Sequence, residues 1–276
     1  MLELMLPPFV ACMLLVAMHS YLGLHIIARE VIFVDLSLAQ MAALGTVVAL
    51  LAGLDPDSRG SYFFALGFTA FGAALFSLTR TAGKGRVPQE AIIGIVYVVA
   101  SAAAILVADK APHGADAIKD ILVGSLIWVT WATNLKIAIA YVILGVFHFV
   151  LRQRFLTISF HPEEADKAGW SIRWWDFWFY LSFGVVITFS VPVGGVLMVF
   201  TFLVVPAAIA FLFTRNMRRL AMISWTSGAV ASALGLWVSY KFDLPTGPLI
   251  VCTYGLLLAV AGILRRLGVG GHEAFG

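Results

Sequence analysis

Apolar runs of membrane-crossing length recur along the whole chain, and they constrain its fold more than any other feature. Charged residues cost about 2.5–3.5 kcal/mol each at the centre of a membrane helix, so clusters of charge mark the ends of the runs. The spans predicted in this way are residues 6–27, 36–54, 61–79, 91–108, 134–151, 176–191, 195–213, 219–240 and 246–264. Of the 276 residues, 61% are hydrophobic and 12% are charged, which excludes an ordinary water-soluble enzyme. We therefore expect an all-α polytopic membrane protein whose residues 1–276 form a single transmembrane domain.

One further apolar stretch, residues 117–131, is too short to cross a bilayer comfortably and is interrupted by Gly124. We expect it to form a re-entrant or surface-lying helix pair. Irregular backbone at membrane depth must line protein or a water-filled cavity, because lipid satisfies none of its polar groups. The segment around Gly124 is therefore a candidate gate.

The basic residues divide unevenly between the two sides of this nine-span arrangement. Of the 18 Lys and Arg residues, all but five lie on one side. The five on the other side are Arg59, Lys110, Lys119, Lys136 and Lys241. Because Lys and Arg concentrate in cytoplasmic loops, we expect the N-terminus outside and the C-terminus in the cytoplasm.

Several classes of function receive no support from the sequence. Cys12 and Cys252 both lie in apolar runs without metal-ligand or disulfide spacing. The Gly-Lys-Gly-Arg segment at residues 83–86 lacks the strand and the Ser or Thr of a nucleotide-binding loop. Ser58, Ser61 and Thr81 have no His and carboxylate placed near them, and no basic domain predicts nucleic-acid binding. We therefore expect neither an enzyme nor a nucleic-acid-binding protein.

The longest polar segment, residues 152–175, lies between the fifth and sixth predicted spans. Pro162 suits the first position of a helix, the acidic residues after it complement the positive end of the helix dipole, and Gly169 suits its C-terminal cap. These features predict a surface helix of about two turns. An ordinary solvated loop is the alternative.

Three stretches resemble the zinc/manganese/iron-type permeases of bacterial ATP-binding-cassette importers. Residues 163–169 (EEADKAG) are similar to the coupling-helix segment of importer permeases, in which an Ala and a Gly four residues apart, here Ala165 and Gly169, follow an acidic start. Residues 193–199 (VGGVLMV) and 203–210 (LVVPAAIA) resemble the family stretch VGxLLV…LLxxPAAxA. Residues 35–45 (DLSLAQMAALG) match the place of the family stretch GDxLxHAxLxG.

The resemblance implies a permease subunit in the bacterial inner membrane, with the fold of cobalamin- and metal-type importer permeases. It implies a dimer, with two identical copies as the simplest form, together with cytoplasmic ATPase subunits that bind ATP and magnesium and an extracytoplasmic substrate-binding protein. The permease would hold no cofactor of its own. The residues implied to receive the ATPase are Glu163, Glu164, Ala165, Asp166, Ala168 and Gly169. The implied cargo is a divalent transition metal, zinc first and manganese or iron next. A metal chelate, another small solute, or a secondary transporter are the alternatives.

The second span departs from the family in its metal-binding pair. An Asp and a His four residues apart are replaced by Leu36 and Gln40, and Asp35 lies about 140° around the helix from Gln40. Ser37, Gln40 and Met41 are therefore expected to line the pathway, together with Gly124, without forming the family's metal clamp.

The best metal-like pattern in the sequence lies on the outer side. His113, Asp116 and Asp120 share one face if residues 114–120 are helical. A capped, solvated helix start is the alternative. His25 in the first span is a further candidate ligand, since neutral imidazole suits zinc or iron, and a single interhelical hydrogen bond is its alternative role.

Overall fold

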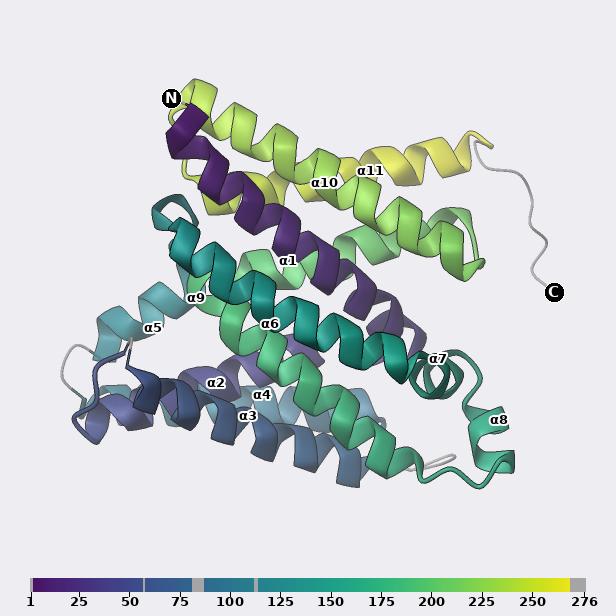
Figure 1. The fold of residues 1–276 in the computed structure, drawn as a ribbon, viewed down its shortest axis with the longest axis horizontal. Helices are drawn as coiled ribbons and strands as arrows, with labels where there is room; N and C mark the ends of the chain where they lie inside the picture. The colour runs from purple at the N-terminus through teal and green to yellow at the C-terminus, as the bar shows by residue number, and fades with distance from the viewer. Residues whose placement is uncertain (1, 57, 81–86, 112–113, 269–276) are drawn as a thin grey trace.

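The helices begin and end close to the boundaries that the charged residues predict. The computed structural model describes residues 2–56, 58–80, 87–111 and 114–268, and every regular element in them is helical (Figure 1). The elements are α1 (Leu2–Ala28), α2 (Val34–Leu51), α3 (Arg59–Thr79), α4 (Gln89–Ala108), α5 (Gly114–Val123), the 3-10 helix η1 (Leu126–Trp128), α6 (Trp131–Val150), α7 (Arg152–Phe160), α8 (Pro162–Lys167), α9 (Ile172–Phe213), α10 (Met217–Phe242) and α11 (Thr246–Arg266). Among these described helices, eight are long and apolar enough to cross a membrane.

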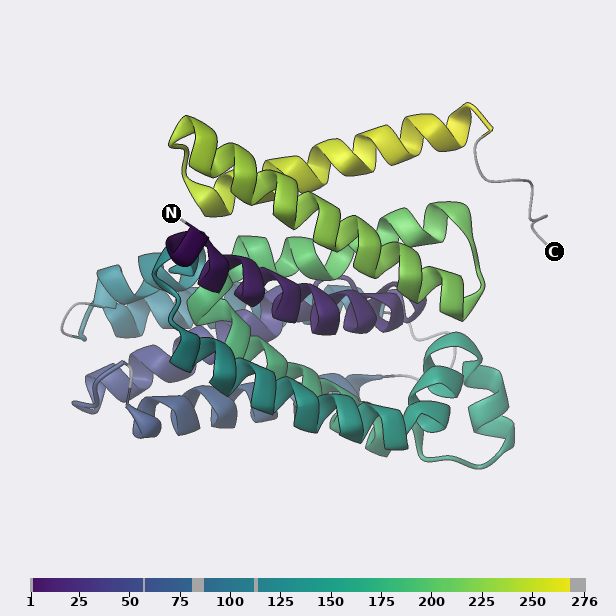
Figure 2. The ribbon, with the colours of Figure 1, turned by 45° about the horizontal axis from the view of Figure 1, so that its top comes forward.

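Helix α9 supplies two of the predicted spans. It has 42 residues, so a straight helix would measure about 63 Å, twice the thickness of a bilayer's hydrocarbon core. Its backbone leaves the helical conformation at Gly195, where φ is 70° and ψ is 159°. The two halves of α9 run in opposite directions in both ribbon views (Figures 1 and 2). The break coincides with the predicted start of the span at residues 195–213.

The two halves of α9 form the centre of the helix bundle. Gly184 in the first half faces Thr69 of α3, and α2 and α4 pack beside α3. In the second half, the Pro206 carbonyl accepts a hydrogen bond of 3.2 Å from Ser224 Oγ of α10, and α1 and α11 pack alongside. The largest side chains of the core include Phe179, Tyr180 and Tyr254, all fully buried.

The connections between helices gather at two ends of the bundle (Figure 1). The α5 end is formed by α5 and the C-terminal ends of α2, α4 and α10. The α8 end is formed by α7, α8 and the C-terminal ends of α1, α3 and α9. The five basic residues of the minority side lie at or near the α5 end, and the described members of the majority lie at the α8 end. Lys84 and Arg86 lie outside the described residues.

The polar segment at residues 152–175 contains two helices rather than the single short helix predicted. α8 is the expected one, with Pro162 at its first position. Gly169, at φ 70°, follows its end, where Gly169 and Trp170 donate backbone hydrogen bonds to Asp166 and Ala165. The sequence does not predict α7, because its hydrophobicity is low and it lacks a capping signal. α9 begins at Ile172, so Asp176 lies inside the helix rather than at its first residue.

The expected helix pair at residues 117–131 is wrong in its second half. α5 ends at Val123, only the three residues of η1 follow, and α6 begins at Trp131. The reason is local hydrogen bonding: the Thr130 side chain caps α6 by accepting from the Thr133 N–H at 3.2 Å.

Candidate functional site

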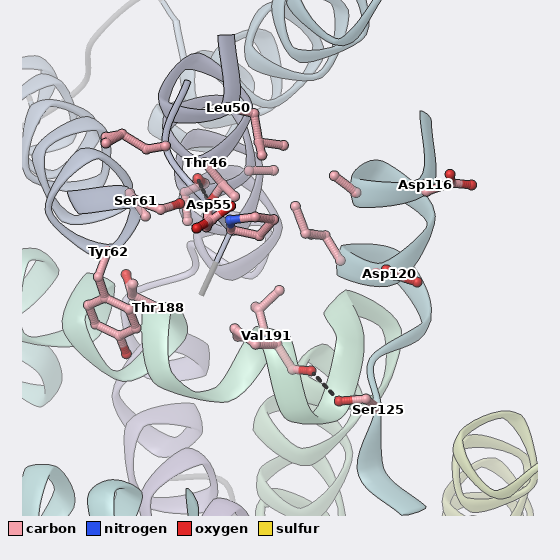
Figure 3. A pocket seen from close by; sticks show the side chains of 18 of the residues that line it. Thr46, Leu50, Asp55, Ser61, Tyr62, Asp116, Asp120, Ser125, Thr188 and Val191 are labelled. Atoms are coloured by element: carbon pink, nitrogen blue, oxygen red, sulfur yellow. Dashed lines mark hydrogen bonds between the residues drawn. The ribbon is translucent and has the colours of Figure 1, made fainter. Parts of the chain in front are cut away.

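A cavity of about 670 Å³ opens at the α5 end of the bundle (Figure 3). It lies between α2, the loop that follows α2, α3, α5 and the first half of α9. The lining residues are Ala42, Ala43, Thr46, Leu50, Gly53, Leu54, Asp55, Pro56, Ser61, Tyr62, Ala65, Asp116, Ala117, Asp120, Ile121, Gly124, Ser125, Thr188, Val191 and Pro192. The predicted gate residue Gly124 and the predicted acidic pair of α5 therefore border one space.

The turn after α5 is held against the break in α9. Carbonyls next to a helix break lack their intrahelical partners. Here the Val193 carbonyl accepts a 3.0 Å hydrogen bond from the Ser125 N–H, and the Pro192 carbonyl accepts one of 3.1 Å from Ser125 Oγ. Gly124 and Gly195 both have positive φ, and a Cβ at either residue would overlap the backbone of the facing segment. The two glycines thus permit the close approach that ties α5 to α9.

The cavity offers oxygen atoms from several elements. The Thr46 and Thr188 hydroxyls donate to the carbonyls of Ala42 and Gly184 within their own helices, so their lone pairs remain as acceptors. Asp55 in the loop before α3 and Ser61 in the first turn of α3 point into the same space in Figure 3. Sequence reasoning missed these residues as a group, because only the folded chain brings α2, α3 and α9 together. The Asp55-Pro56 pair in the short loop before α3 was the sequence feature that pointed to this part of the lining.

The two acidic residues of α5 lie at the rim of the cavity. The predicted helix exists as α5, and Asp116 and Asp120 share one of its faces. Both are exposed, and in Figure 3 their carboxylates lie on the side of α5 away from the cavity centre. His113 lies outside the described residues. Within the described part of the chain, no group of three His, Cys, Asp or Glu residues is placed to hold a metal ion.

The predicted pathway residues of α2 lie deeper than the cavity lining. Ser37, Gln40 and Met41 are buried within the chain, and α2 lines the cavity from Ala42 onward. Asp35, in the first turn of α2, is 1% exposed. Among the described residues, neither its Oδ1 nor Ser37 Oγ has a hydrogen-bond partner. The start of α2 thus carries buried oxygen atoms that no described residue satisfies.

His25 lies in the last turn of α1, near the α8 end. It is therefore at the opposite end of the bundle from Asp116. Its Nδ1 is 2.8 Å from Ser159 Oγ of α7. His148 of α6 is similarly paired through Nε2 with Ser182 Oγ of α9 at 2.8 Å. These contacts match the interhelical hydrogen bonds that were the alternative to metal binding.

The segment predicted to receive an ATPase projects from the α8 end (Figure 2). Glu163, Glu164, Asp166, Ala168 and Gly169 are exposed, whereas Ala165 is fully buried. Ala165 therefore anchors α8, and the acidic side chains face outward. The return to α9 is held by the Arg154 guanidinium, which lies 3.8 Å from the centre of the Trp170 ring.

The chain is similar to a known protein family, to two bacterial membrane proteins and to one solved structure. The sequence profile of the ABC 3 transport family matches residues 1–265. The manganese transport system membrane protein MntC of Listeria innocua is 25% identical over 245 residues, which cover 87% of this chain and 83% of the relative. The manganese import system permease protein ScaB of Streptococcus gordonii is 25% identical over 244 residues, with the same coverage. In the structure of PsaBC from Streptococcus pneumoniae in complex with Fab, one chain superposes with a TM-score of 0.77 and 20% identity, covering 94% of this chain and 90% of that one.

Proposed function

The chain belongs to the ABC 3 transport family, and from this premise we propose that it is the permease subunit of an ATP-driven importer of divalent transition metals. It is the membrane subunit and not the ATPase. The observation that carries the proposal is the pairing of an oxygen-lined cavity at the α5 end with an exposed acidic helix at the α8 end. In this layout, cargo enters at the α5 end and the ATPase binds at the α8 end.

The distribution of basic residues supports an orientation for this arrangement. The α8 end carries most of the Lys and Arg residues, which favours its placement in the cytoplasm. The N-terminus would then lie outside the bacterial inner membrane and the C-terminus inside. An extracytoplasmic binding protein would dock at the α5 end, and the ATPase subunits would bind α8. The exposed apolar faces of α4, α6 and α11 are available to lipid and to a second permease copy.

Manganese is the first cargo to test, because the relatives MntC and ScaB are both named for it. Zinc, which the sequence resemblance placed first, and iron are the competitors. Hard oxygen ligands suit manganese better than they suit softer metals. The hydroxyls of Thr46, Ser61 and Thr188 and the carboxylate of Asp55 provide such ligands to an ion that keeps part of its water shell.

A metal chelate is the second candidate cargo. The cavity is about 670 Å³, whereas one water molecule occupies about 30 Å³ of liquid. The cavity is therefore many times larger than a bare ion. The family's Asp and His are also replaced by Leu36 and Gln40, so this chain lacks the clamp that a dehydrated ion would need.

Transport would follow an alternating-access cycle. Cargo delivered at the α5 end would enter the cavity between α2, α3, α5 and α9. Closure of the ATPase subunits would push on residues 163–169 and tilt the helices connected to them. The turn at Gly124 and Ser125 would move with the break in α9, because hydrogen bonds join the two. The α5 end would close as the α8 end opens.

The experiment compares ATP hydrolysis by the reconstituted permease and ATPase with metal-free binding protein and with binding protein loaded with manganese, zinc or iron. We expect stimulation by the loaded protein, largest for manganese. In a control variant, a flexible linker of equal length replaces residues 163–169, and the ATPase should then no longer bind. ATPase that binds the control equally well, or hydrolysis that no loaded binding protein stimulates, would contradict the proposal.

A further inference from the structure

A single buried carboxylate joins the ends of three long helices near α7 and α8. Asp176 of α9 accepts a 2.7 Å hydrogen bond at Oδ1 from Arg29 Nη1, just beyond the end of α1. Its Oδ2 accepts one of 2.5 Å from Arg80 Nη1, at the end of α3. The side chain of Asp176 is fully buried, and those of Arg29 and Arg80 are 1% and 17% exposed. α1, α3 and α9 therefore share one ion-pair cluster, which we name the Asp176 cluster.

Helix α7 is bound to the same cluster through a hydroxyl. Ser159 Oγ accepts a 2.7 Å hydrogen bond from Arg29 Nε. The same oxygen lies 2.8 Å from His25 Nδ1 and forms a second hydrogen bond there. The Arg29 guanidinium also lies 3.9 Å from the centre of the Phe179 ring of α9. Arg29 thus contacts α7 and α9 together from the end of α1.

The cluster lies on both chain routes that lead away from α8. α7 precedes α8 and ends at Phe160, one residue after Ser159. α9 follows α8 and carries Asp176 near its start. A displacement of α8 therefore reaches Arg29 through Ser159 and reaches Asp176 through the first residues of α9.

The cluster also contains an excess of positive charge. Two guanidinium groups face one carboxylate, and Arg29 Nη2 is buried without a hydrogen-bond partner among the described residues. A buried ion pair of this kind contributes little net stability by itself, but the loss of one partner leaves an uncompensated charge.

We propose that Asp176 is a positioning residue that transmits the movement of α7 and α8 to α1 and α3, so that ATP hydrolysis by the subunits bound at α8 moves the helices that enclose the pathway. The proposal rests on the proposed function, because it requires an ATPase at α8. α3 lines the cavity directly, and α1 packs against the second half of α9. Arg80 and Arg29 therefore carry one movement to both sides of the bundle.

The test uses the complete complex in lipid vesicles and measures manganese ions transported per ATP hydrolysed. Asp176→Asn keeps the size of the side chain and removes its charge. We expect this variant to retain the ATPase subunits and basal hydrolysis while the transport ratio falls at least tenfold. Asp176→Glu should restore part of the ratio. The matched control is Asp109→Asn, which removes the exposed 2.8 Å ion pair with Lys110 at the α5 end and should leave the ratio unchanged.

Melting temperature and retention of the ATPase separate coupling from misfolding. An assembled Asp176→Asn complex with the wild-type ratio would overturn the proposal. If Asp176→Asn does not assemble, Arg80→Gln decides, because Arg80 is partly exposed and its loss leaves the Arg29 pair intact. A reduced ratio in assembled Arg80→Gln supports the proposal, and an unchanged ratio overturns it. Wild-type complex that shows no ATP-dependent uptake would instead refute the proposed function.

Discussion

Replacement of Gly124 by alanine tests the contact between the turn after α5 and the break in α9. Gly124 has φ 73°, and a side chain in this left-handed region costs about 1–2 kcal/mol. Its new Cβ would also overlap the backbone of Gly194 and Gly195. Overpacking of this kind costs about 1–3 kcal/mol. We therefore expect Gly124→Ala to destabilise the protein by about 2–5 kcal/mol in total.

Two other glycines separate these contributions. Gly53 has φ 80°, and no atom lies within 4 Å of the place that a Cβ would take, so Gly53→Ala should lose only the backbone contribution of about 1–2 kcal/mol. Gly94 is helical and equally open, so Gly94→Ala should be neutral or stabilise by up to about 1 kcal/mol.

Thermal unfolding of the purified permease in detergent measures all three variants. An additional loss of about 2 kcal/mol in Gly124→Ala relative to Gly53→Ala corresponds to a melting temperature lower by roughly 4–8 °C. Uptake should also fall more in Gly124→Ala, because the turn is displaced from α9. Equal destabilisation in Gly124→Ala and Gly53→Ala would refute the close contact between the turn and the break.

Three further substitutions address the α5 end and the start of α2. Ser125→Ala removes the hydrogen bond to the Pro192 carbonyl and should destabilise the protein by about 1 kcal/mol in the same melting assay. An unchanged melting temperature would argue against this hydrogen bond. Asp35→Asn removes a buried carboxylate whose Oδ1 has no partner among the described residues, so stability should stay equal or rise while metal uptake falls. Wild-type uptake by Asp35→Asn would show that transport does not use the carboxylate. The double variant Asp116→Asn/Asp120→Asn alters exposed rim residues, so the free energy of unfolding should change by less than about 0.5 kcal/mol. The apparent KM for loaded binding protein should rise several-fold at low salt. An unchanged KM would exclude these carboxylates from docking.

The spans could be predicted from the sequence because the cost of inserting charge is local. Each predicted boundary lies within a few residues of a helix end, and Gly195 marks the break that turns one long helix into two crossings. The surface helix α8 was also predictable, since Pro162 and Gly169 carry its start and stop signals in the sequence itself. α7 carries no such signal.

The cavity and the Asp176 cluster could not be predicted in the same way, because both depend on contacts between distant residues. Asp176 reads in the sequence as an ordinary charge at the end of a span. Only the folded chain shows that Arg29 and Arg80 bury it. Likewise, the sequence places Gly124 at a gate, but its partner across the contact, Gly195, is separated from it along the chain by α6, α7 and α8.

The most direct test of the proposed function is manganese uptake by vesicles that contain the permease and its ATPase, with metal-loaded binding protein on the α5 side. We expect uptake only when ATP is present on the α8 side, and we expect it to persist when ionophores abolish proton and sodium gradients. Uptake that needs no ATP and stops when those gradients are abolished would contradict an ATP-driven importer and would indicate a secondary transporter.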